Sequence, residues 1–525
     1  MILRGLLKKM GAKRTEGKGY TFICSKYGTH SNINGCVFPY LTDRKLGYGI
    51  WAGKWLWNND KLFQQNGIKI PTIHMEYFGR TDMLKYYIRR MKEKLFIKKA
   101  VRNMKVMWIT NIPVGGMAEH LKTKNGVWMD ALLNQLVNYN DLQFIIVTTW
   151  NVKSIEHLIK DGIEYYLLPG GNASSYKRKE SLATKDWNTV ISETQPSVIH
   201  VWGTEYPHAI PALKVADHLK IPSLIYIQGI MKAIARWADG CVNVSTMLRY
   251  TTMRDIYRGQ LWAFQNRWFE KRTETEEKLI SLSGNVVVEN NWAELFCKSI
   301  NPNLSVFKIP LNINEVFYKH EWAIEKVKRH SILCNASGPS YKGIHYLIMA
   351  LTIVAKRYPD VKLYIPGRSM IIGNGFFEKQ KMPGYYSYIT NIIKKNGLIN
   401  NVEFTGYLEQ EELAQRLSKT HVFVLASSIE NHSSSLKEAM AVGTPAIASQ
   451  VGGVPEYFEY GKCGYSYRYQ EYECLAGYIC MMFENDDLCQ EYSRSSRIIA
   501  NATSNESING KIISMYRELG GKEDR

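Results

Sequence analysis

The stretch SSIENHSSSLKEAMAVGTPAIASQVGGVPE, residues 427–456, places Glu430 eight positions before Glu438. It follows the apolar run VFVLAS, which is typical of a buried strand, and a helix is expected to begin near Ser434. In doubly wound parallel sheets, ligands bind beyond the carboxyl ends of the strands, where helix starts present free amides. These amides and the positive end of the helix dipole suit a phosphate oxygen. The expected phosphate-binding positions are Ser434, Ser435 and Leu436.

The two carboxylates lie on either side of this helix start. A carboxylate accepts hydrogen bonds from hydroxyl groups, often two at once from a vicinal diol. A phosphate between two polyols describes a nucleotide sugar, so Glu438 is expected to hold the ribose and Glu430 the transferred sugar. Two glutamates at this spacing are common on solvated surfaces. The small-residue helix, Gly-Thr-Pro turn and apolar strand of AMAVGTPAIAS favour the site over a chance pair.

Working outward, short β-rich runs alternate with helical patterns from Lys105 onward, which predicts an α/β fold with two doubly wound parallel sheets. The stretch 301–318 breaks the rhythm with two prolines and is the expected linker. The predicted domains are residues 105–315 and 316–490, followed by a helix over 491–525 that packs back across them. Residues 1–104, rich in glycine and aromatic residues, form an extension that the pattern leaves unassigned.

Composition indicates a soluble globular chain, with 45% hydrophobic and 22% charged residues among 525. The nine cysteines are scattered and form no C-x-x-C motif, which argues for a reducing cytosol and against a zinc site. No secretory signal and no apolar run long enough for a membrane span is expected. The net charge of +19 favours an anionic partner, such as a phosphate-bearing small molecule, nucleic acid or an anionic membrane.

The segment LKYYIRRMKEKLFIKKAVRNMK, residues 84–105, holds nine basic residues and one acidic residue, with apolar side chains at helical spacing. This pattern is typical of a basic amphipathic helix that contacts an anionic membrane surface. A connecting helix packed by one face on its own domain has the same pattern, so both interpretations stay open.

The motif E-N-H-S-S-S-L-K-E-A-M at 430–440 resembles the E-x7-E signature of the family-four retaining glycosyltransferases of the GT-B fold. It is more similar still to a bacterial polysaccharide-synthesis branch, which reads E-N-S-P-N-S-L-G-E-A-M. His432, Ser433, Ser434 and Lys437 depart from that branch. The segments PSYKGIHYLIMAL (339–351), VEFTG (402–406) and VIHVWGTEYPH (198–208) resemble further family motifs, so the likeness covers about residues 105–519.

The resemblance implies a retaining, metal-independent enzyme without a cofactor, which moves a sugar from a nucleotide diphosphate to an acceptor in a cleft between two Rossmann-like domains. Lys342 matches the family's phosphate-binding lysine and is expected, with Glu430, to be catalytic; a lysine there would neutralise charge on the departing phosphate. The family's usual arginine five positions earlier is replaced by Ser337. Arg368, after the strand VKLYIPG, is a candidate substitute for donor binding, although a surface arginine fits equally well.

In the first domain, Asn125 and Gly126 match the family's glycine loop and are expected to approach the donor, with Gly115 and Gly116 as a nearby rival pair. Three further residues are expected to position the acceptor or the reacting sugar from strand ends that face the cleft: Gln228, Glu205 and His200. Many relatives have a histidine where Gln228 stands, but its amide can only exchange hydrogen bonds. His200, within an apolar strand, also fits a satisfied core residue, and Glu205 an exposed loop carboxylate.

The predicted function is transfer of a sugar to a glycan or lipid-linked acceptor in polysaccharide synthesis, in the cytoplasm or at the inner face of the membrane. Two alternatives remain open: a nucleotide-sugar-binding protein inactivated by loss of the arginine, and a GT-B epimerase or phosphorylase. Nucleic-acid binding is not expected, because no basic-aromatic module is present. A dinucleotide oxidoreductase is excluded by the lack of G-x-G-x-x-G after a first strand. The base, sugar and acceptor depend on pocket contacts that no motif reports.

Overall fold

The computed structural model describes residues 12–14, 20–22, 104–123, 127–371, 373, 375–502 and 505–521. The chain divides into two compact units, Met1–Arg102 and Asn103–Arg525. In the first, β1 (Ala12–Arg14) pairs antiparallel with β2 (Tyr20–Phe22). The predicted basic helix over 84–105 lies outside the described residues except for Met104 and Lys105, which already belong to the first strand of the second unit.

The first large sheet of the second unit has the strand order β10-β9-β8-β7-β3-β4-β6-β5. All neighbours are parallel except the edge strand β5, which runs antiparallel to β6. Its central strands are buried on both faces because helices cover both, as parallel sheets require, whereas the edge strands β5 and β10 are partly exposed. The strands are β3 (Met104–Thr110), β4 (Leu142–Trp150), β5 (Glu156–Lys160), β6 (Ile163–Pro169), β7 (Val198–Trp202), β8 (Ser223–Tyr226), β9 (Asn285–Val288) and β10 (Ser305–Lys308).

The second large sheet is fully parallel, with the order β13-β12-β11-β14-β15-β16. Counted along the chain this is 3-2-1-4-5-6, and the parallel strands of the first sheet follow the same scheme with one more at the edge. The predicted doubly wound architecture is therefore confirmed in both sheets. The strands are β11 (Lys328–Leu333), β12 (Lys362–Pro366), β13 (Val402–Gly406), β14 (Thr420–Leu425), β15 (Ala446–Ser449) and β16 (Gly464–Tyr467).

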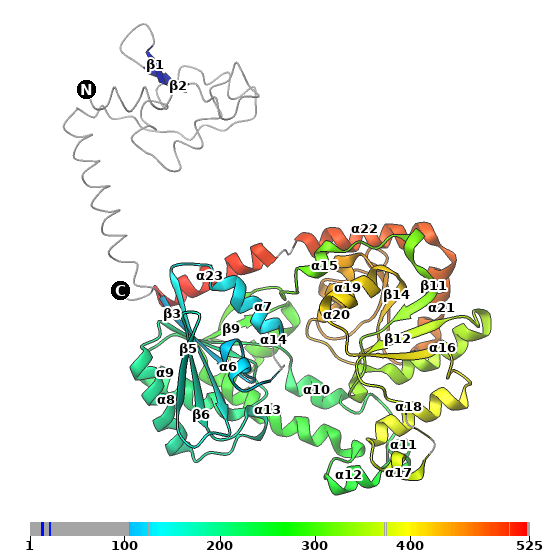
Figure 1. The fold of residues 1–525 in the computed structure, drawn as a ribbon, viewed down its shortest axis with the longest axis horizontal. Helices are drawn as coiled ribbons and strands as arrows, with labels where there is room; N and C mark the ends of the chain where they lie inside the picture. The colour runs from blue at the N-terminus through cyan, green and yellow to red at the C-terminus, as the bar shows by residue number, and fades with distance from the viewer. Residues whose placement is uncertain are drawn as a thin grey trace, which may run out of the picture. The chain divides into compact units, whose positions relative to one another are not determined.

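Helices lie on both faces of each sheet (Figure 1). Those of the first domain and its connections are α6 (Gly116–His120), α7 (Val127–Leu136), α8 (Glu180–Thr194), α9 (Ile210–His218), α10 (Met231–Trp237), α11 (Val244–Arg249), α12 (Met253–Tyr257), α13 (Gln265–Leu282), α14 (Asn291–Ile300) and α15 (Val316–Lys319). Those of the second domain and the chain end are α16 (Ile344–Arg357), α17 (Phe376–Gln380), α18 (Gly384–Lys395), α19 (Gln410–Ser418), α20 (Ser434–Val442), α21 (Tyr472–Glu484), α22 (Asp486–Ala502) and α23 (Asn505–Gly520).

The expected linker over 301–318 is partly wrong, because it contains the edge strand β10, which pairs parallel with β9. This strand is only four residues long and half-exposed, so its pattern is too short to register as a strand. The chain crosses to the second sheet between Lys308 and Lys328.

The end of the chain connects the two domains. Helix α22 packs on α20 of the second domain, and α23 packs on the first sheet, where Ile512, Tyr516 and Leu519 are buried beside Trp108 (Figure 1). Trp108 Nε1 donates a hydrogen bond to the Tyr516 hydroxyl at 2.9 Å. The first domain's core therefore includes a helix from the far end of the chain.

Candidate active site

Each sheet has a switch point where consecutive helices leave on opposite faces, between β3 and β7 in the first and between β11 and β14 in the second. The loop after β11 carries Ser337 to Lys342, and the loop after β14 carries Ser427 to Ser433. The two loops touch: the Ser428 amide donates to the Tyr341 carbonyl at 2.7 Å. The sequence motifs that predict the site thus converge at the carboxyl ends of the two central strands, β11 and β14, of the second sheet.

Gly343 makes this convergence possible. Its φ is +71°, and a Cβ there would lie 1.8 Å from the Ala426 carbonyl oxygen at the end of β14. Only glycine combines that conformation with that approach. The turn before α16 therefore holds Lys342 directly against the β14 loop.

Lys342 and Glu430 form an ion pair, with 2.7 Å between Nζ and Oε1. The Ser427 hydroxyl donates to the same carboxylate oxygen at 2.6 Å. The side chains are 31% and 12% exposed, so the pair is shielded but reachable. Burial lowers the pKa of Lys342, but the Glu430 carboxylate raises it by more, so the net pKa is above its ordinary value and the amine stays charged. An incoming phosphate would compete with Glu430 for this cation.

Helix α20 begins at Ser434, as predicted, with Ser433 as its N-cap. The Ser433 hydroxyl accepts from the Leu436 amide at 3.3 Å and lies 3.1 Å from the Ser435 hydroxyl. The amides of Ser434 and Ser435 have no acceptor within the helix, because the first N–H groups of a helix never do. Since Leu436 is fully buried, only its neighbours at the helix start reach solvent.

Lys437, which stands where the branch motif has glycine, turns away from this start. It is 3% exposed, and its ammonium donates to the Leu311 carbonyl in the interdomain segment. Burial lowers its pKa to about 8. Lys437 therefore connects α20 to the segment between the domains, and its charge acts on Glu289, a lining residue of the cavity between the two domains.

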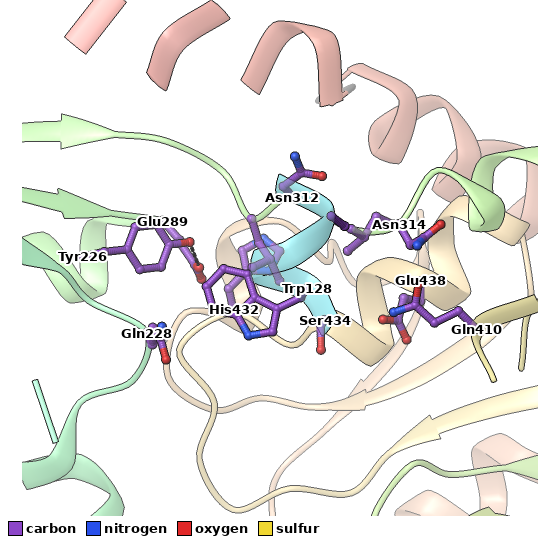
Figure 2. Close-up of a pocket in the computed structure, with 13 residues that line it drawn as sticks. Trp128, Tyr226, Gln228, Glu289, Asn312, Asn314, Gln410, His432, Ser434 and Glu438 are labelled. Atoms are coloured by element: carbon purple, nitrogen blue, oxygen red, sulfur yellow. Dashed lines mark hydrogen bonds between the residues drawn. The ribbon is translucent and has the colours of Figure 1, made fainter. Parts of the chain in front are cut away.

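A cavity of about 400 Å³ opens between the two domains at the start of α20 (Figure 2). Among its lining residues are carboxyl, amide, hydroxyl and aromatic groups, but no lysine or arginine. They are Trp128, Ala131, Tyr226, Gln228, Glu289, Leu311, Asn312, Ile313, Asn314, Gln410, His432, Ser434 and Glu438.

Two carboxyl groups in this cavity are protonated more readily than usual. Burial raises the pKa of Glu438 to about 7 and that of Glu289 to about 8. The Tyr226 hydroxyl donates to Glu289, and both side chains enter the cavity from the ends of neighbouring strands (Figure 2). A carboxyl group near its pKa can accept or donate a hydrogen bond, which suits sugar hydroxyls.

His432 lies between these groups with its ring stacked on Tyr457, 3.9 Å between centroids. Burial lowers its pKa to about 3, so it is neutral at physiological pH. Its stacking partner also accepts a hydrogen bond from the Ser433 amide at 3.0 Å. His432, which departs from the branch motif, thus stacks on the same tyrosine that holds the Ser433 amide in the loop before α20.

The first sheet presents polar residues at its own switch point. Asn111 follows β3 and Glu205 follows β7; the Asn111 amide donates to Glu205 at 2.6 Å. Burial raises the pKa of Glu205. The Arg272 guanidinium of α13 lies 5.1 Å from the Tyr206 ring centroid, and its charge acts on both Glu205 and Tyr341. The charge of Arg272 therefore acts on residues of both switch-point loops.

Asn431 joins the domains directly. It is 5% exposed, and its Nδ2 donates to the Ile227 carbonyl at the end of β8 at 2.9 Å. Asn290 Nδ2 in turn donates to the Asn431 carbonyl at 2.8 Å. The asparagine that follows Glu430 in the motif therefore fixes the β14 loop to the first domain.

The structure corrects the expected position of His200. It is 1% exposed, Nδ1 lies 2.7 Å from the Tyr516 hydroxyl, and the ring stacks on Trp202. Burial lowers its pKa to about 3. His200 points into the core toward helix α23 and does not face the cleft. Helix α23 covers the face of β7 from which the His200 side chain projects.

Other predicted residues have different outcomes. Arg368 is exposed, and its charge acts on the Tyr386 hydroxyl; its backbone carbonyl accepts from the Ser337 hydroxyl at 2.8 Å. Asn125 and Gly126 lie outside the described residues. In the rival pair, the Gly115 amide donates to Asp130 at 2.7 Å.

The cavity brings together Gln228, Ser434 and Glu438 among the predicted residues, while Lys342 and Glu430 pair beside it. It also contains Trp128, Tyr226, Glu289 and Gln410, which no motif indicated. Glu289 directly follows a buried strand, so the rule that located Gln228 could have located it as well. Trp128 and Gln410 carried no comparable signal.

These features define the class of protein: two parallel α/β domains with a cleft at their facing switch points, the GT-B fold. A sucrose-phosphate synthase structure from Thermosynechococcus elongatus shares it, with a TM-score of 0.57, 16% identity, and coverage of 80% of this chain and 99% of that chain. A structure of HepE from Anabaena in complex with UDP has a TM-score of 0.54 and 15% identity, covering 79% and 100%. At these identities the likeness shows the fold alone.

The second domain narrows the class further: residues 319–499 match the family described as "Glycosyl transferases group 1". A mannosylfructose-phosphate synthase of Agrobacterium fabrum is 29% identical over 121 residues, which are 23% of this chain and 25% of that protein. An N-acetyl-alpha-D-glucosaminyl L-malate synthase of Bacillus anthracis is 23% identical over 166 residues, 32% and 40% of the two chains. The match thus spans between a quarter and two-fifths of the length of these curated relatives. None of the described helices is long and apolar enough to cross a bilayer.

Proposed function

We propose that this protein is a retaining, metal-independent glycosyltransferase that moves a sugar from a nucleoside diphosphate to a glycan or lipid-linked saccharide. The observation that carries the proposal is the Lys342–Glu430 ion pair at the switch point beside the start of α20. A cation, a free helix start and a carboxylate together match the charge and hydroxyl pattern of a nucleotide sugar.

In the proposed reaction, the bond between the anomeric carbon and the β-phosphate oxygen breaks while an acceptor hydroxyl oxygen bonds to the same face of that carbon. The hydroxyl proton passes to the departing phosphate oxygen. Lys342 and the amides at the start of α20 stabilise the charge that grows on the diphosphate, which is the largest contribution such a site makes. The proposal requires no metal ion and no cofactor, because this chain's own groups carry that charge.

The remaining residues receive supporting roles. Glu430, released from Lys342 by the diphosphate, holds hydroxyls of the transferred sugar, and Glu438 holds the ribose. Gln228 positions the sugar from the first domain, and Glu205 contacts the acceptor. Asn125 and Gly126 remain candidates for the donor loop, and we place the protein in the cytoplasm or at the inner face of a membrane.

The names of similar proteins support the donor and acceptor classes. HepE has been solved in complex with UDP, and a putative colanic acid biosynthesis glycosyltransferase of Salmonella typhimurium is 25% identical over 160 residues. A polysaccharide acceptor and a uridine nucleotide are therefore the first substrates to test.

A thermal-shift series with UDP, GDP and ADP sugars tests donor binding. We expect one nucleotide class to raise the melting temperature, and the corresponding free diphosphate to raise it more than the monophosphate, because Lys342 and the helix start bind the β-phosphate. If no nucleotide sugar stabilises the protein at saturating concentration, the proposal is wrong.

Turnover then tests the site. Lys342→Ala and Glu430→Gln should each lower acceptor-dependent release of the nucleoside diphosphate by about two orders of magnitude, as with other lost electrostatic contacts. Lys462→Ala removes an exposed lysine that pairs only with Glu459, and it should leave turnover unchanged. Equal rates for all three variants would contradict the assignment.

A nucleotide-sugar-binding protein without turnover is the second candidate. It is favoured by one observation: Ser337, in place of the family's arginine, only bonds to the Arg368 carbonyl and brings no charge. Donor binding without release of diphosphate, over a panel of saccharide acceptors, would favour this candidate.

A further inference from the structure

Two short helices, α11 and α12, lie against the second domain next to α17 and α18, and they have apolar side chains on their outer faces (Figure 1). Val244 and Leu248 of α11 are 57% and 53% exposed, and Met253, Ile256 and Tyr257 of α12 are 63%, 58% and 93% exposed. Single exposed apolar residues are ordinary on protein surfaces, but a contiguous group marks an interaction site. The five residues lie within fourteen consecutive positions of the chain.

The helical spacing places the exposed apolar residues of each helix in one stripe. Positions i, i+3 and i+4 share one face of a helix, so Val244 and Leu248 point the same way, as do the three residues of α12. The inward positions are already filled: Met247 is 2% exposed in the core, and Asp255 caps α12. Helix α11 therefore packs inward through Met247 and α12 through the buried Asp255, and both helices carry apolar side chains on the outward face.

Basic residues flank the stripes. Arg249 and Arg258 are exposed on the same two helices, and Lys379 and Lys381 are exposed on the neighbouring α17 segment. The segments are joined by hydrogen bonds from the Met253 amide to Gln380 at 2.9 Å and from the Thr252 hydroxyl to the Met382 carbonyl at 2.7 Å. Figure 1 shows α11, α12 and α17 gathered at one end of the two-domain unit.

We propose that this apolar-basic face, formed by the stripes of α11 and α12 with Arg249, Arg258, Lys379 and Lys381, docks on an anionic lipid surface. The apolar side chains enter the headgroup boundary, and the long basic side chains reach lipid phosphates around them. A soluble acidic protein would satisfy the arginines and lysines but would leave no reason for aliphatic side chains that stand outward on both helices. The docking does not depend on the proposed catalysis.

Flotation of the full chain with vesicles tests the proposal. The protein should bind vesicles of phosphatidylcholine mixed with phosphatidylglycerol and should not bind phosphatidylcholine alone. Leu248→Glu/Ile256→Glu should lower the partition coefficient at least about tenfold, and Arg249→Glu/Arg258→Glu by about fivefold or more for each charge removed. All four positions are exposed, so the variants should fold.

The matched control is Arg494→Glu/Ile498→Glu, which changes an exposed arginine and a 70% exposed isoleucine on α22. It should bind vesicles as the wild type does. Patch variants that bind within twofold of the wild type would overturn the proposal, as would a wild type that does not bind anionic vesicles. A wild-type dimer in sedimentation that the patch variants lose would instead show that the face joins two copies. Donor binding measured without lipid keeps this result separate from the proposed function.

Discussion

Glu289 makes the stability of the protein depend on pH. Burial holds its pKa near 8 against an ordinary value of 4.5, so between these values the folded protein keeps a proton that the unfolded chain has lost. The stabilisation that comes from this raised pKa is complete below about pH 4.5 and is lost as the pH rises through about 8. The unfolding free energy should fall by at most about 1.4 kcal/mol per pH unit for this group.

Glu289→Gln should therefore flatten the decline in stability between about pH 5 and about pH 8, as measured by urea unfolding. The slope should not vanish, because Glu438 has a pKa raised in the same direction. Exposed Glu274→Gln serves as the control and should keep the wild-type slope. An unchanged slope in Glu289→Gln would mean that this carboxyl is not the group that titrates.

Arg272 is the residue that we expect to offset the charge missing at Ser337. Its guanidinium lies 5.1 Å from the Tyr206 ring centroid, and its charge acts on Tyr341, which precedes Lys342 in the chain. Arg272→Ala should lower turnover about tenfold or more while the nucleoside monophosphate binds as before, because the lost contact involves the second phosphate. Lys271→Ala, exposed on the same helix, should have no effect. Equal loss of monophosphate binding would point to a structural role.

Residue-level prediction can give a position where a motif fixes both the residue and its place after a strand, while the roles of such residues stay predictions. Lys342, Glu430 and Glu438 are brought to one region because β11 and β14 adjoin at the switch point. The position of His200 at the cleft was predicted wrongly. The period-two alternation separates the two faces of a strand but does not say which element covers each face. That face is covered by α23, more than three hundred residues later in the chain.

At the scale of elements, the turn before α16 is the most constrained part of the site. Gly343→Ala adds a methyl group 1.8 Å from the Ala426 carbonyl oxygen and also strains a φ of +71°. Gly461→Ala has a similar φ of +75° with no heavy atom within 4 Å, so it isolates the conformational cost of about 1 kcal/mol. Gly343→Ala should cost at least about 2 kcal/mol more in urea unfolding and should lower turnover. Equal costs would show that the close approach is relaxed in solution.

Element prediction was good for long periodic segments and poor for short ones. The start of α20 and the strand–helix alternation of the second domain follow the sequence pattern, and the strand before α20, β14, is a run of fully buried residues. The edge strand β10 was missed because four half-exposed residues show no decisive period. The lining of the cavity was largely missed because its residues come from both domains and the segment between them.

At the scale of the whole molecule, helix α23 closes the core of the first domain. The Tyr516 hydroxyl accepts from Trp108 and contacts His200, all three buried. Tyr516→Phe keeps the ring but leaves the indole N–H without an acceptor, which should cost about 1–3 kcal/mol. Tyr407→Phe, at an 87% exposed site, should be neutral. A neutral Tyr516→Phe in urea unfolding would mean that water replaces the hydroxyl.

The order of synthesis gives the position of α23 a consequence. The ribosome completes every strand of both sheets before it makes residues 505–520. Until then, Trp108 and its apolar neighbours in the first domain are not covered by α23. During that interval the nascent chain exposes an apolar surface that chaperones can bind. Premature termination near residue 500 would leave that apolar surface permanently exposed.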